Sequence, residues 1–113
     1  MNSDLRLGRA SRVLWQAHEA LADYPSVEDA IQSSSCPLQV ADCWITLSRR
    51  GTQFELNGVG ALLWESLSTP QRVTDLSSYV RSVFDVGSIG DLSSLDSFFA
   101  SLLEHRLVEQ YRE

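Results

Sequence analysis

Residues 56–67 read LNGVGALLWESL, and within this segment a strand-like pattern changes to a helical one. Asn57 is a favourable helix N-cap, and the apolar residues after it recur at helical spacing. These residues are Val59, Leu62, Leu63 and Leu67. The segment predicts a helix that begins after Asn57 and ends at Ser68-Thr69-Pro70. Gly58 and Gly60 weaken its first turn, so we expect them to allow a close approach to the preceding strands. We expect Trp64 to be buried, because a large aromatic side chain on a short helix rarely stays exposed.

The residues before this helix predict a β-hairpin. Residues 38–48 are rich in β-branched and apolar side chains, residues 49–51 (RRG) supply a turn, and Thr52–Leu56 alternates polar and apolar residues. The alternation places Phe54 and Leu56 on one face and Gln53 and Glu55 on the other. Arg49 and Arg50 at the tip are expected in a solvated turn.

Two further helices are predicted after residue 70. The second helix has Thr74 as its cap, carries Leu76, Val80, Val83 and Phe84 on one stripe, and ends near residues 85–87. After a linker at residues 87–90, a capping-box pattern at residues 93–96 begins a third helix, spanning Leu92 to Arg106. Its apolar stripe consists of Leu95, Phe98, Phe99, Leu102 and Leu103. Leu107-Val108 predicts a short extended tail.

The first 37 residues favour a helical extension ahead of a domain at residues 38–113. Arg9–Ala22 has apolar residues at helical spacing and is ended by Tyr24-Pro25. Ser26 caps a short helix that reaches about Gln32, and residues 33–37 predict a linker. Residues 12–15 (RVLW) equally suit a β-strand, so this alternative stays open.

Composition narrows the function classes. The 113 residues suffice for one domain, and 15 acidic residues against nine basic ones, all arginine, give a net charge of −6. Such a chain is a poor partner for nucleic-acid phosphates or an anionic membrane. The sequence has no apolar run long enough to span a bilayer and no signal peptide, so a cytoplasmic location is expected. Cys36 and Cys43 are then expected to be reduced and half-buried.

No catalytic, metal or cofactor motif is present. His18 and His105 lie far from the two cysteines in the sequence, so no finger-like metal spacing results. Gly58-Val59-Gly60 lacks the last glycine of a dinucleotide-binding loop, and no P-loop or nucleophile elbow occurs. A small cysteine-dependent enzyme would lack a placed base. By elimination the sequence indicates a non-catalytic binding module that needs neither a metal nor a cofactor.

Over residues 40–110 the sequence resembles the PqqD family, which includes the pyrroloquinoline quinone biosynthesis protein D and the related RiPP recognition elements. Four pieces in order carry the resemblance: Leu56-Asn57 with Leu63-Trp64 and Leu67, then Val73-Thr74-Asp75-Leu76, then Phe84-Asp85-Val86, and then Phe98 to Leu102 running on to Leu107-Val108. Each piece alone reads as ordinary capped amphipathic helix. Their order and spacing make the resemblance specific.

The resemblance implies an α+β, winged helix-turn-helix-like domain, a small antiparallel sheet followed by three helices, that binds peptides. In this family the leader segment of a ribosomally made precursor peptide adds as an extra strand beside the last sheet strand, opposite the third helix, and is presented to a radical SAM enzyme, a leader peptidase or a cyclase. The implied peptide-binding residues are Thr52, Gln53, Phe54, Glu55, Phe98, Phe99, Leu102 and Arg106. The family usually has another strand before the hairpin, a position at which residues 1–37 favour helix.

Two alternatives remain open at this point. Phe98 and Phe99 point about 100° apart on a helix, so either both fill a wide core or one of them lines a peptide groove. Arg106 either pairs with an acidic leader residue or favours the helix C-terminus. A winged-helix DNA-binding regulator is the rival function. A major-groove helix needs several basic or amide side chains, and here Arg106 is opposed by Asp96 and Glu104.

Overall fold

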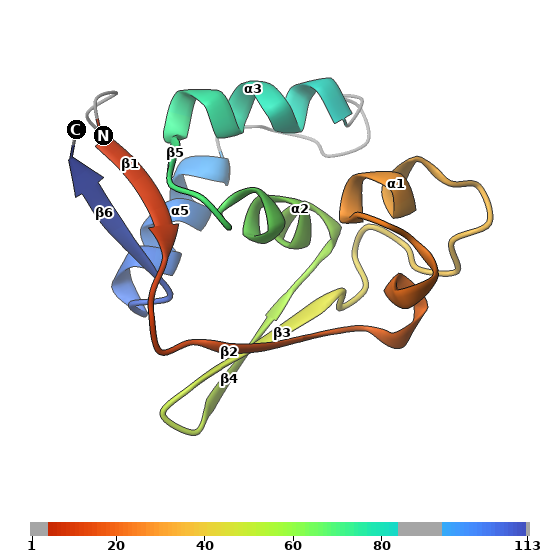
Figure 1. Cartoon of the computed structure of the whole chain (residues 1–113), viewed down its shortest axis with the longest axis horizontal. Helices are drawn as coiled ribbons and strands as arrows, with labels where there is room; N and C mark the ends of the chain where they lie inside the picture. The colour runs from red at the N-terminus through yellow and green to blue at the C-terminus, as the bar shows by residue number, and fades with distance from the viewer. Residues whose placement is uncertain (1–4, 84–93, 113) are drawn as a thin grey trace. The chain divides into compact units, whose positions relative to one another are not determined.

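A computed structural model describes residues 5–83 and 94–112. The described residues form a mixed α+β fold with two three-stranded antiparallel sheets and four α-helices (Figure 1). The chain divides into two compact units. We call residues 12–65 the central unit, and residues 1–11 together with 66–113 the terminal unit.

The central unit is built on the predicted hairpin. Strands β3 (Ile45–Arg49) and β4 (Thr52–Leu56) pair in antiparallel fashion, and β2 (Leu14–Ala17) lies on the other side of β3, giving the order β2-β3-β4. Figure 1 shows these three strands side by side. Arg50 and Gly51 form the turn with φ angles of 50° and 81°, and Arg49 pairs with Thr52. Two positive φ angles in a two-residue loop match the right-handed twist of paired strands.

Helix α2 (Gly58–Ser66) begins where the sequence predicts. The Gly60 N–H donates to the Asn57 Oδ1 at 2.9 Å, so Asn57 is its cap. A Cβ on Gly58 would lie 3.2 Å from the Trp44 Cε2, which confirms that Gly58 permits a close approach. Trp64 is buried, as predicted, and so are Ala61, Leu62 and Leu63, so this helix is apolar around most of its circumference.

The N-terminal helical extension predicted from the sequence is wrong. Instead of a helix over Arg9–Ala22, the chain forms β1 (Leu5–Arg9), β2 and a short 3-10 helix, η1 (Glu19–Asp23). The alternative of a strand near residues 12–15 is the correct one. Pairing with β3 decides the outcome, because a ladder of interstrand hydrogen bonds outweighs a coincidental helical spacing.

Two short-range signals in this region behave as the chemistry requires. The alternation of Leu5 and Leu7 with polar or small residues is the signal for β1 that the helical pattern obscured. Helix α1 (Val27–Gln32) confirms the prediction made from Ser26, whose hydroxyl accepts from the Asp29 N–H at 3.1 Å. The Glu65 carboxylate also accepts from the Val27 N–H, at 3.0 and 3.1 Å.

The terminal unit joins both ends of the chain in one sheet. Strand β1 lies between β5 (Gln71–Arg72) and β6 (Val108–Arg112), and Figure 1 shows β1 beside β6. Strand β6 confirms the predicted extended tail. Helices α3 (Val73–Val83) and α5 (Ser94–Glu104) complete the unit.

The helical stripes of the terminal unit are buried largely as predicted. Leu76 and Val80 on α3 are buried, as are Phe99 and Leu102 on α5. Helix α3 begins at Val73, one residue before the predicted cap, because β5 leads directly into it. Phe84, the expected helix end at residues 85–87, the linker at 87–90 and the expected helix start at Leu92 lie outside the described residues.

Candidate functional site

Strand β4 is an edge of its sheet, and the orientation of its backbone follows from the hairpin. In a hairpin with a two-residue loop, the residues flanking the loop exchange both backbone hydrogen bonds, and every second pair along the ladder does the same. These pairs are Arg49–Thr52, Leu47–Phe54 and Ile45–Leu56. The N–H and C=O groups of Gln53 and Glu55 therefore point away from β3. Within the described part of the chain, no hydrogen bond to either residue is found across this edge.

The side chains of β4 leave this edge accessible. Thr52, Gln53 and Glu55 are exposed, Phe54 is half-buried and Leu56 is buried, which confirms the predicted alternation. Proteins commonly block a sheet edge with lysine, proline or a bulge that twists the edge away. Thr52–Leu56 contains neither lysine nor proline. The edge has the features of a strand that accepts another strand.

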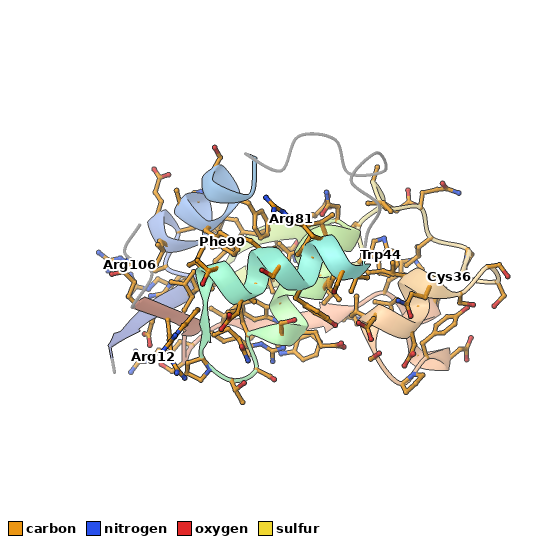
Figure 2. The ribbon with its side chains drawn as sticks, turned by 90° about the horizontal axis from the view of Figure 1, so that it is seen from above. Arg12, Cys36, Trp44, Arg81, Phe99 and Arg106 are labelled. Carbon is orange, nitrogen blue, oxygen red and sulfur yellow. The ribbon has the colours of Figure 1, made fainter. Side chains whose placement is uncertain are left out.

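The four candidate residues on α5 fall into two classes. Phe99 has no exposed surface and Leu102 is 5% exposed, so both belong to the core of the structure. Phe98 is half-buried and Arg106 is exposed. The rings of Phe98 and Phe99 meet edge to face, with centroids 6.2 Å apart. Figure 2 shows Phe99 and Arg106 on this helix and just after it. Of the two phenylalanines, Phe98 is the one with surface available to a ligand.

Arg106 ends α5 in a left-handed backbone conformation with φ of 57°. The Arg106 N–H donates to the Leu103 carbonyl at 3.1 Å, and the Leu107 N–H donates to the Leu102 carbonyl at 2.9 Å. This pair of bonds is a Schellman motif, a helix ending that usually places glycine where Arg106 stands. Its exposed guanidinium lies beside the helix carboxyl end, where a cation is favourable.

The structure groups the sequence-predicted site residues by unit. Thr52, Gln53, Phe54 and Glu55 lie together on β4 in the central unit. Phe98, Phe99, Leu102 and Arg106 lie together on or next to α5 in the terminal unit.

A further hollow, which the sequence did not reveal, lies at the end of β2. It has a volume of about 400 Å³ and is lined by Gln16, Ala17, His18, Glu19, Cys43, Trp44 and Thr46. Its two reactive side chains make local contacts: the His18 Nδ1 accepts from the Ala20 N–H at 3.0 Å, and the Cys43 Sγ lies 3.6 Å from the Thr46 Oγ1. The sequence analysis missed this hollow because it assigned residues 9–22 to a helix.

Other site chemistries find no support in the described residues. Cys36 and Cys43 are free thiols and half-buried, the burial predicted for them. Across residues 5–83 and 94–112, no group of three or more histidine, cysteine or acidic side chains is arranged to hold a metal ion. No helix in the same ranges is long and apolar enough to cross a membrane.

Comparison with known proteins identifies the family. The model of the family described as coenzyme PQQ synthesis protein D (PqqD) matches residues 43–108, from just before β3 to the first residue of β6. Searches of curated proteins and of solved structures gave no match. The family match spans more than half of the chain and includes β4 and α5. The chain therefore belongs to the PqqD family, the family of RiPP recognition elements.

Proposed function

We propose that this chain binds the leader segment of a ribosomally synthesised precursor peptide and presents the peptide to a modifying enzyme, without catalysing a reaction itself. The leader adds as a fourth strand to the sheet β2-β3-β4, along β4. The observation that carries this proposal is the outward orientation of the Gln53 and Glu55 backbone groups, within the segment that matches the PqqD family. Family membership supports the proposal, because the family is generally non-catalytic.

Binding by strand addition suits the chemistry of this edge. Backbone hydrogen bonds supply affinity for any extended peptide, and side-chain contacts on the two faces supply selectivity. One face of β4 offers the half-buried ring of Phe54, and the other offers the exposed side chains of Gln53 and Glu55. A leader strand with apolar residues at alternate positions matches this arrangement.

The residues of α5 form a second part of the proposal, which rests on the family resemblance. Phe98 and Arg106 have accessible surface, so we assign them to direct contact with the peptide. Phe99 and Leu102 are buried and keep α5 in its conformation. An acidic leader residue would find a bidentate partner in Arg106.

Proline substitution tests the strand edge. Gln53→Pro and Glu55→Pro each remove an outward N–H and leave the β3–β4 hydrogen bonds in place, because neither N–H takes part in them. Each is expected to weaken binding of the leader encoded beside the gene by about tenfold, measured by isothermal titration calorimetry. Gln53→Ala, which keeps its N–H, is the matched control and is expected to bind like the parent. Thermal melts establish that each variant is folded. Parent-like affinity in both proline variants would exclude β4 as the binding edge.

A processing assay tests presentation to the enzyme. The modifying enzyme encoded beside the gene is expected to act on its full-length precursor faster when the chain is present. Gln53→Pro is expected to remove most of this acceleration, whereas Gln53→Ala keeps it. Equal rates with and without the chain would show that peptide binding does not serve presentation.

A further inference from the structure

The sheet of the central unit has a second edge, β2, whose chemistry differs from that of β4. Leu14 is 74% exposed and Trp15 is 48% exposed, the large apolar side chains with the most exposed surface among the described residues. Residues 13–17 contain no charge and no proline, so none of the usual protections of an edge is present. Exposed apolar surface at an unprotected edge favours association with another strand.

The orientation of Leu14 and Trp15 defines the kind of partner that covers both. They are adjacent on a strand, so their side chains point to opposite faces of the sheet. A helix lying on one face would cover only one of them. A strand paired along β2 places its own side chains on both faces and covers both.

The ladder between β2 and β3 shows which backbone groups of β2 face this edge. The His18 N–H donates to the Trp44 carbonyl at 2.8 Å, and Gln16 and Leu14 are the next alternate residues, opposite Thr46 and Ser48. These three residues point their backbone groups toward β3. The backbone groups of Val13, Trp15 and Ala17 therefore point away from β3, toward the edge.

We propose that β2 pairs with β2 of a second copy of this chain, in antiparallel orientation about a two-fold axis at Trp15. In this register Trp15 lies opposite Trp15 of the other copy, and Leu14 lies opposite Gln16 of the other copy on the same face. Gln16 and Thr46 line the hollow of about 400 Å³. Leu14 of each copy therefore reaches the hollow of the other, while the two tryptophans meet across the axis.

Charge complementarity selects a second copy as the partner. The same register sets Arg12 opposite His18 of the other copy, next to Glu19, and both Arg12 and Glu19 are exposed (Arg12 is labelled in Figure 2). The central unit carries three arginines against seven acidic residues, so two copies repel each other except where opposite charges meet. One edge thus supplies the apolar side chain, the hollow that receives it, the cation and the anion, as a two-fold symmetric interface requires.

The oligomeric state of the full chain tests the proposal. Sedimentation equilibrium from about 1 to 200 µM is expected to show a monomer–dimer equilibrium. Leu14→Lys is expected to raise the dissociation constant about a hundredfold, about tenfold for each of the two leucines at the interface. Ser34→Lys adds the same charge at an exposed site elsewhere in the central unit and is expected to keep the parent's dissociation constant. A parent chain that stays monomeric over this range, or a dimer unaffected by Leu14→Lys, overturns the proposal.

Charge exchange tests the register. Arg12→Glu and Glu19→Arg are each expected to weaken the dimer about tenfold, and the double variant is expected to recover most of the loss, because each copy then offers the reversed pair. A double variant weaker than both single variants contradicts the register. Leader affinity separates this proposal from the binding function: Leu14→Lys is expected to bind the leader like the parent. A loss of leader binding in Leu14→Lys would place the peptide on β2 and overturn both proposals.

Discussion

Arg106 is held in a conformation that a side chain rarely adopts. Its φ of 57° lies in the left-handed region, where a Cβ costs roughly 1 kcal/mol. The position ends α5 through two backbone hydrogen bonds, so the strain is tolerated for the sake of the turn into β6. An arginine in a position that favours glycine suggests that the side chain serves a purpose beyond folding.

The first prediction separates the fold from the function at this residue. Arg106→Gly is expected to stabilise the chain by about 0.5–1 kcal/mol, because it relieves the left-handed strain. Arg106→Glu keeps the strain and reverses the charge, so it is expected to leave the melting temperature close to that of the parent. Both are expected to weaken leader binding, Arg106→Glu more strongly. Chemical denaturation and calorimetric titration measure the two effects. A destabilised Arg106→Gly variant would contradict the conformational argument.

The second residue-scale prediction concerns the contact between Gly58 and Trp44. A Cβ at position 58 would lie 3.2 Å from the indole Cε2, and the ring has little room to move, because it is buried and its Nε1–H donates to the Gln39 carbonyl at 2.8 Å. Gly58→Ala is therefore expected to destabilise the chain by about 1–2 kcal/mol. In a Trp44→Leu background the same substitution is expected to cost less. Equal costs in both backgrounds would show that the indole is not the obstacle.

At the scale of elements, two helices depend on leucines with almost no exposed surface. Leu63 on α2 is fully buried, and Leu102 on α5 is 5% exposed. Leu63→Ala and Leu102→Ala are each expected to cost about 2–5 kcal/mol, from lost burial plus the cavity left behind. Ser97→Ala, at an exposed position of α5, is the control and is expected to change stability by less than about 0.5 kcal/mol. Parent-like melts of both leucine variants would contradict the observed burial.

Strand β1 connects the two other strands of the terminal sheet. Strands β5 and β6 each pair with β1 and not with each other, and the Ala10 N–H also donates to the Leu107 carbonyl at 3.1 Å. Deletion of residues 1–10 is expected to remove the hydrogen-exchange protection of β6 amides and to leave that of β3 unchanged. Adding a peptide of residues 1–10 is expected to restore part of this protection. Retained protection in the deletion variant would mean that β6 does not depend on β1.

At the scale of the whole molecule, charge argues against the rival DNA-binding function. The net charge is −6, and the exposed residues described on α5 are Ser97, Ala100, Ser101 and Glu104, none of them basic. We predict no sub-micromolar DNA binding at physiological salt, because phosphate contacts need clustered positive charge. Gel shifts with genomic fragments measure this. Sequence-dependent retention at sub-micromolar protein would overturn the peptide-binding proposal.

A titration of ¹⁵N-labelled chain with the leader reports on both groups of proposed site residues at once. Amides of Thr52–Leu56 are expected to shift through strand addition, and amides of Phe98–Arg106 through side-chain contact. Proline substitution at Gln53 is expected to reduce both sets of shifts, since one peptide causes them. Shifts confined to residues 1–37 would instead place the binding surface at the N-terminal end of the chain.

The sequence by itself determined the features that depend on neighbouring residues. The hairpin, the caps at Asn57 and Ser26, the alternation along Thr52–Leu56 and the family pieces all follow from side-chain chemistry over short spans. For the same reason the proposed edge strand was named correctly as a strand, and its residues were assigned to the right faces.

Only the tertiary structure decided where residues distant in sequence pair. Residues 12–17 suit either a helix or a strand locally, and pairing with β3, about 30 residues later, makes them a strand. The same holds for β1, whose partners β5 and β6 lie at the other end of the chain. Burial likewise separated Phe98 from Phe99, which the sequence left as equals. Long-range pairing is decided by the sum of many weak contacts, so no local pattern contains it.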